Sequence, residues 1–83
     1  MLEVRHARYV GDYRIEIMFN TGESGVVDLT QSLWGPVFDP LRSKERFAKF
    51  TLSPILHTVA WDNDADFAPE YLLDKMREQR HSA

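Results

Sequence analysis

Residues 13–19, YRIEIMF, decide the fold class, because apolar and charged side chains alternate along this stretch. Successive side chains of an extended chain point to opposite sides, so Ile15 and Ile17 share one face. The charged side chains of Arg14 and Glu16 share the other face. The alternation therefore predicts a β-strand that is buried on one face and wet on the other.

Turn-forming residues on both sides of this stretch predict that it lies between two further strands. Gly11 and Asp12 precede it and residues 20–22 follow it, and both clusters suit tight reversals of the chain. Outside them, residues 2–10 and 25–30 predict two weaker strands, and we expect the even-numbered residues of the first to share one face. The N-terminal third therefore predicts a three-stranded antiparallel meander.

Glycine and proline exclude a long helix from the middle of the chain. Gly35, Pro36 and Pro40 cannot all lie inside one continuous helix. Asp39 followed by Pro40 is typical of an N-cap and the first helical position, which predicts a short helix over about residues 40–48.

The last third predicts two short strands and a C-terminal helix. Residues 49–52 and 56–61 are rich in strand-forming side chains, and Pro54 interrupts them. Residues 69–79 follow the helical period, with an apolar stripe along one side. Together these elements predict one α+β domain over residues 1–83, in which a small, mainly antiparallel sheet is joined by a short middle helix and packs against the C-terminal helix.

Composition limits the classes of protein to which the chain can belong. The chain has 83 residues, of which 43% are hydrophobic and 28% charged, as in ordinary folded domains. It contains no cysteine, which excludes thiol chemistry and fits a cytoplasmic location. Its apolar runs are far shorter than the roughly 20 residues needed to cross a membrane, and we expect no membrane association. The net charge of −3 is not that of a nucleic-acid binder.

The stretch WDNDADFAPEYL, residues 61–72, has two interpretations. Its alternating aspartates match the start of an EF-hand calcium loop, but Phe67 replaces the glycine of that loop and Leu73 replaces its bidentate glutamate. We therefore expect a turn that leads into a helix, and no cofactor. A cation-binding protein or small metal-dependent enzyme remains an alternative, and it would use Asp62, Asp64, Asp66 and Glu70.

Two groups of residues are candidates for contact with a partner. Trp34 lies in a Gly-Pro loop close to Phe38, so we expect it to be partly exposed and to suit a protein interface, whereas Trp61 is expected in the core. A nucleic-acid-associated regulator would instead use a basic cluster: Arg42, Lys44, Arg46 and Lys49. No spacing of histidines or serines is typical of a catalytic site, so we do not expect an enzyme.

Three runs, IEIMFNTGESGVVDL, VFDPLRSKERF and TVAWDNDADFAPEYL, together resemble the bacterial domain of unknown function 2442 family. That family has a strand that ends in phenylalanine before a Gly-Glu turn, and later a Trp-x-Asn-Gly-x-Asp turn before a helix. The matching positions include Phe19, Gly22, Glu23, Val27, Asp28, Leu29, Phe38, Leu41, Phe47, Trp61, Asn63, Asp66, Tyr71 and Leu72. Asp64 departs from the pattern, because the family usually has glycine there.

The resemblance implies a small α+β domain that occurs alone or beside a helix-turn-helix domain. It implies no reaction and no catalytic residues. Genes of the family often neighbour those of other small proteins, which implies an accessory or antitoxin-like role. The chain lacks the helix-turn-helix extension, so we do not expect it to bind nucleic acid. We expect a non-enzymatic cytoplasmic interaction or regulatory module that binds a protein encoded nearby, and that also associates with itself.

Overall fold

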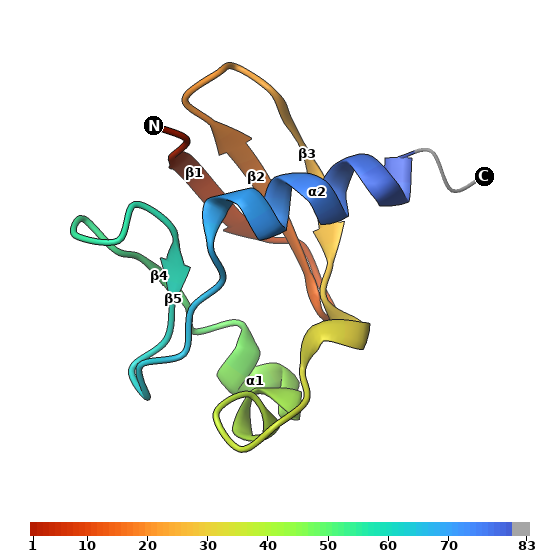
Figure 1. Ribbon diagram of the computed structural model, residues 1–83. Helices are drawn as coiled ribbons and strands as arrows, with labels where there is room; N and C mark the ends of the chain where they lie inside the picture. Colours follow the sequence, from red (N-terminus) through yellow and green to blue (C-terminus); the bar gives the residue numbers. More distant parts are fainter. Residues whose placement is uncertain (81–83) are drawn as a thin grey trace.

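The computed structural model describes residues 1–80 and confirms an α+β fold (Figure 1). A three-stranded antiparallel sheet with the order β1-β2-β3 forms the N-terminal part. Its strands are β1 (Val4–Tyr9), β2 (Arg14–Phe19) and β3 (Ser24–Asp28). The central strand follows the alternation of the sequence, since Ile15 and Ile17 are buried while Arg14 and Glu16 are exposed.

β1 departs from the simple alternation expected for it. Val4 pairs with Phe19 and His6 pairs with Met18, so Arg5 is an extra residue in a β-bulge. After the bulge, the odd-numbered residues of β1 pack against the core. The expectation that the even-numbered residues share one face is therefore wrong beyond Val4, because a bulge exchanges the two faces of a strand.

Both connections within this sheet are tight turns, as predicted. Gly11 and Asp12 have φ angles of +106° and +49°, and Gly22 has a φ of +90°. The Gly22 N–H donates to the Phe19 carbonyl at 2.9 Å. These left-handed conformations are the ones that glycine and aspartate tolerate.

The middle of the chain forms short turns of helix rather than one continuous helix. They are the 3₁₀ helices η1 (Thr30–Ser32) and η2 (Asp39–Arg42) and the α-helix α1 (Lys44–Phe47). The prediction that Asp39 caps the helix is wrong, because the residue before η2 is Phe38 and no side chain caps it. Instead the Ser43 side chain accepts a hydrogen bond from the Arg46 N–H at 3.4 Å, which starts α1 separately.

The two later strands are shorter than expected and form a sheet of their own. β4 (Thr51–Leu52) pairs with β5 (Val59–Ala60) in an antiparallel arrangement. Residues 54–57 form the turn between them, in which His57 has a φ of +56°. The Ser53 hydroxyl oxygen accepts hydrogen bonds from the two N–H groups at residues 55 and 56, which holds this turn and prevents a strand from starting at residue 56.

The C-terminal helix α2 (Pro69–Arg80) crosses one face of the three-stranded sheet (Figure 1). It buries Leu72, Leu73 and Met76 in the core. It approaches β3 so closely that a Cβ atom on Gly25 would lie 3.0 Å from the Met76 sulfur. The position therefore suits glycine.

The end of α2 covers the free edge of β3. The Gln79 side-chain amide accepts from the Asp28 N–H at 2.8 Å and donates to the Asp28 carbonyl at 2.7 Å. Arg80 donates to the Ser24 carbonyl at 2.8 Å. These bonds take up backbone groups that an exposed strand edge would otherwise offer to another chain. In the part of the chain that the structure describes, no helix is both long enough and apolar enough to cross a bilayer.

Candidate interaction site

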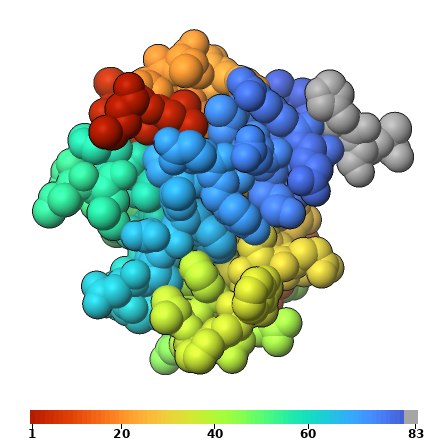
Figure 2. All heavy atoms as spheres, viewed as in Figure 1, coloured from red at the N-terminus to blue at the C-terminus, as the bar shows by residue number. Residues whose placement is uncertain are grey.

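An apolar groove of about 410 Å³ lies where the segment before η2 meets the start of α2. Figure 2 shows the yellow-green part of this segment packed below the blue start of α2. The lining comes from two distant parts of the sequence: Ser32, Trp34 and Phe38, and Asp66, Phe67, Ala68 and Tyr71.

Three aromatic rings form a near-parallel stack along the groove. Phe67 stacks on Phe38 with ring centroids 4.7 Å apart, and on Tyr71 with centroids 5.4 Å apart. The Phe67 side chain is buried, whereas Trp34 is 73% exposed. The groove therefore combines a fixed aromatic wall with an indole that is open to solvent.

Hydrogen bonds hold the two sides of the groove together. The Ser32 and Tyr71 hydroxyl oxygens lie 2.6 Å apart, which joins η1 to α2. The Asn63 amide donates to the Val37 carbonyl at 3.0 Å, and its oxygen accepts from the Ala65 N–H at 3.2 Å. The groove is therefore formed before any partner arrives.

The other residues that match the family pattern lie outside the groove lining, in the core or in turns and surface bonds. Phe19 and Trp61 are buried, and the Trp61 indole donates to the Phe47 carbonyl at 3.0 Å. The Asp28 carboxylate accepts from the N–H and the hydroxyl of Thr30, at 2.9 and 2.6 Å. The expected contrast between a buried Trp61 and an exposed Trp34 is confirmed.

The predicted basic cluster does not come to the groove. Lys44 lies 3.1 Å from a carboxylate oxygen of Asp12, and this hydrogen bond raises the pKa of the Lys44 ammonium. Lys49 lies 3.8 Å from Glu45. Arg46 and Lys49 line a separate hollow of about 260 Å³. Carboxylates therefore neutralise part of the cluster.

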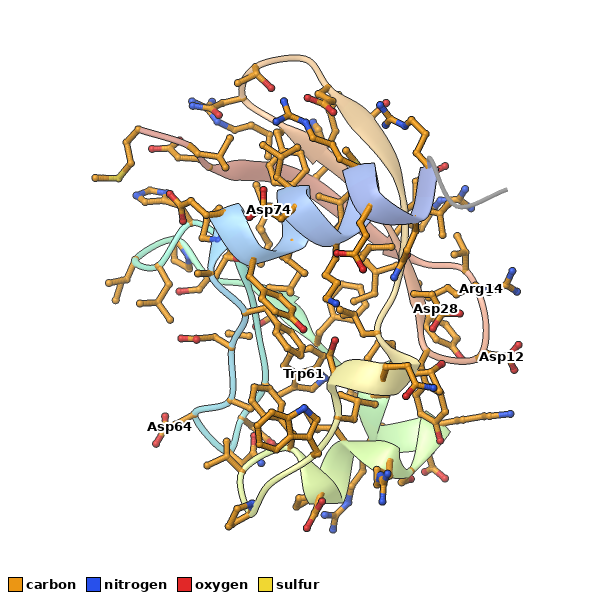
Figure 3. All side chains as sticks on the ribbon, turned by 45° about the vertical axis from the view of Figure 1, so that its right-hand side comes forward. Asp12, Arg14, Asp28, Trp61, Asp64 and Asp74 are labelled. Atoms are coloured by element: carbon orange, nitrogen blue, oxygen red, sulfur yellow. The ribbon has the colours of Figure 1, made fainter. Side chains whose placement is uncertain are left out.

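The aspartates of residues 62–66 form the predicted turn. The Trp61 N–H donates to the Ala65 carbonyl at 2.9 Å, and Asp64 has a φ of +69°. Asp62 and Asp64 are exposed, and Asp64 points away from the body of the molecule (Figure 3). Asp66 instead lines the groove. Among residues 1–80, no three histidine, aspartate or glutamate side chains gather closely enough to hold a metal ion.

Charged side chains that lack an ion-pair partner are distributed unevenly over the fold. Within the described residues, every lysine and arginine except Arg42 and Arg46 lies within ion-pair distance of a carboxylate. The carboxylates without such a cation are Asp28, Asp39, Asp62, Asp64, Asp66, Glu70 and Asp74. Most of them belong to the turn before α2 and to the first half of that helix.

The sequence predicted Trp34 and Phe38 as interface residues, and both line the groove together with Phe67 and Asp66, which were not predicted for an interface. A signal for the ring stack was present, because Phe67 and Tyr71 are four residues apart, a spacing that places side chains together at a helix start. No local pattern places Phe38 against Phe67, because 29 positions of sequence separate them.

Comparisons with known proteins agree with this fold. The model of the family described as "Protein of unknown function (DUF2442)" matches residues 4–78. The crystal structure of the "Putative DNA Binding Protein" of Nitrosomonas europaea superposes with a TM-score of 0.82 and 23% sequence identity. The match covers 96% of this chain but 52% of the other, so this chain spans about half the length of that protein. No curated protein matches the chain.

Proposed function

This chain belongs to the DUF2442 family, and on that premise we propose that it is a non-enzymatic interaction module whose partner docks in the aromatic groove. In this proposal it works in the cytoplasm, as the regulatory or antitoxin-like partner of another protein encoded nearby. The observation that carries the proposal is Trp34, which is 73% exposed beside a preformed apolar groove.

The exposed indole of Trp34 contributes little to the packing of the fold. Its neighbours Leu33 and Phe38 contribute to the core or pack against it, whereas Trp34 does not. Burial of an aromatic side chain removes about 150–250 Å² from water, which is a large share of what a small interface gains. Tryptophan is also enriched among the residues that dominate binding energy. Covering Trp34 with a partner would therefore stabilise a complex without any change in the fold.

Affinity capture tests the proposal, with the tagged chain as bait in an extract of the organism that encodes it. We expect the wild-type chain to retain a defined partner and Trp34→Ala to lose it. Ile55→Ser is the matched control, because Ile55 is 84% exposed on the turn between β4 and β5, outside the groove. The proposal fails if the chain is strictly monomeric and retains no partner, or if Trp34→Ala retains the partner as well as the wild type does.

A nucleic-acid-associated regulator is the second candidate. Two observations favour it: the name of the similar Nitrosomonas protein, and the absence of an ion pair at Arg42 and Arg46 within residues 1–80. Against it, phosphate contacts need free cations, and Lys44 and Lys49 are already paired. This candidate predicts that the chain binds a labelled DNA duplex and that added salt weakens the binding steeply. The double variant Arg42→Ala/Arg46→Ala should no longer bind the duplex. Binding that is insensitive to salt would exclude it.

A further inference from the structure

Charge around the groove indicates what kind of protein occupies it. Resting on the proposed function, we infer that the occupant is a basic protein segment. In this segment an apolar side chain packs against Trp34 and the ring stack, and a neighbouring lysine or arginine pairs with Asp66. The structure supplies three reasons, which concern the lining, the surrounding charge and the fixed geometry.

Asp66 is the charged residue in the groove lining. Its side chain is half-buried, and within residues 1–80 no lysine, arginine or histidine lies within ion-pair distance of it. Its backbone is held by an antiparallel bridge to Ala60, which places the residue at the edge of the groove. A carboxylate next to an apolar surface is an acceptor for a cation that arrives on an otherwise apolar segment.

The charges near the groove repel anions. Glu70 at the start of α2, like the aspartates of the preceding turn, has no lysine or arginine within ion-pair distance among the described residues. The cation that lies against the ring stack is Lys75, whose ammonium is 5.8 Å from the Tyr71 ring centroid and 3.7 Å from Glu78. A basic segment would complement this field, whereas phosphates or an acidic segment would meet like charges.

The apolar part of the site is rigid and has room for a side chain. Its volume of about 410 Å³ falls within the range of roughly 300–1,000 Å³ that is usual for ligand pockets. The ring stack and the bond between Ser32 and Tyr71 fix its shape. Binding therefore orders few groups of this chain, which favours recognition of a short segment.

NMR titration of the ¹⁵N-labelled full chain tests the inference with three synthetic peptides. The first, KKLFKK, is basic and apolar. The second, EELFEE, keeps the apolar pair and reverses the charge, and the third, KKSSKK, keeps the charge and removes the apolar pair. We expect KKLFKK to shift the amide signals of residues 32–38 and 66–71, and the other two peptides to bind at least several-fold more weakly.

Two variants separate the role of Asp66 from that of general charge. Asp66→Asn should weaken the binding of KKLFKK about two- to fivefold, the size of one partly exposed ion pair. Asp64→Asn removes the same charge from a side chain that points away from the body, and it should have a smaller effect (Figure 3). Raising salt from about 0.01 M to about 1 M shortens the Debye length from about 30 Å to about 3 Å and should weaken the binding further.

The outcomes distinguish this inference from the proposed function. Equal binding of EELFEE and KKLFKK at the groove would overturn the inference and leave the groove as an interaction site. Signals that shift only outside residues 32–38 and 66–71, no binding of KKLFKK, or an unchanged affinity in Asp66→Asn would also overturn it. Loss of the captured partner in Trp34→Ala is a separate result that bears on the proposed function alone.

Discussion

Polar residues serve opposite purposes at two ends of this small fold: the helix-sheet end, where α2 packs on β3, and the groove end, formed by residues 32–38 and 66–71. At the helix-sheet end, Arg77 donates two hydrogen bonds to Glu23 at 3.0 and 2.7 Å, and Gln79 takes up both backbone groups of Asp28. At the groove end, Asp66 has no cation partner among the described residues and Trp34 is open to solvent. The first end is therefore complete in the isolated chain, whereas the second has unused binding capacity.

The outer face of the three-stranded sheet is a second surface on which the charged side chains are already paired. It carries a hollow of about 660 Å³ lined by side chains that include His6, Arg8 and Glu16. Arg8 donates two hydrogen bonds to Glu16, at 3.1 and 3.0 Å, so the charges of this hollow balance each other. A large hollow with neutralised charges is a weaker candidate than a smaller apolar one beside a free carboxylate.

The largest expected effect is on the free energy of unfolding, which a core substitution should lower much more than a groove substitution. Leu72 is fully buried, so Leu72→Ala should lower the free energy of unfolding by about 2–5 kcal/mol. Trp34→Ala removes a larger side chain but should change it by less than about 0.5 kcal/mol, because Trp34 is exposed. Urea denaturation measures both values. Similar losses in the two variants would show that Trp34 belongs to the folding core.

A smaller effect is expected where α2 covers the edge of β3. Gln79→Ala removes the two hydrogen bonds to Asp28 and should lower the free energy of unfolding by about 1 kcal/mol. It should also promote association at high concentration, because it uncovers a strand edge. Urea denaturation and light scattering check the two effects. Glu78→Ala, at an exposed neighbouring position, serves as the control and should cause neither.

Stability should fall in acid because of Glu23. The hydrogen bond from Arg77 lowers the pKa of the Glu23 carboxyl below its ordinary value of 4.5, and the charges of Arg77 and Arg80 act in the same direction. A lowered folded-state pKa stabilises the fold above pH 4.5, and this contribution is lost as the pH falls through the folded-state value. Melting temperatures between neutral pH and acid should fall less in Glu23→Gln than in the wild type. An equal fall in both would assign the acid sensitivity to other carboxyls.

The smallest effect is expected at Asp64. Its φ of +69° favours glycine, but glycine also gives the unfolded chain more freedom, so the two effects oppose each other. Asp64→Gly should therefore keep the fold and change the free energy of unfolding by less than about 1 kcal/mol. Thermal and urea denaturation check this. A large loss would reveal a role of the Asp64 carboxylate that its outward position does not suggest.

Local patterns predicted most of the fold but little of the site. The alternation of residues 13–19, the turn glycines and the apolar stripe of α2 act over a few neighbouring residues, so the sequence displays them directly. The bulge at Arg5 and the late start of β5 at Val59 depend on pairing and turn bonds between elements. The groove joins residues 32–38 to residues 66–71, and only the folded chain brings these segments together.

Ion pairing was likewise hidden from the sequence. Arg77 and Glu23 are separated by 54 positions, and Lys44 and Asp12 by 32. The basic cluster around α1 therefore looked freer in the sequence than it is in the fold. The exposed tryptophan was the exception, because a Gly-Pro sequence beside it already indicated a loop.

We propose above all that a partner binds at the groove end. Amide hydrogen exchange of the chain alone and of the chain with its captured partner tests this claim most directly. We expect slower exchange in residues 32–38 and 66–71 of the complex, and unchanged exchange in β1 and β2. Slower exchange in β1 and β2 with no change at the groove would contradict it.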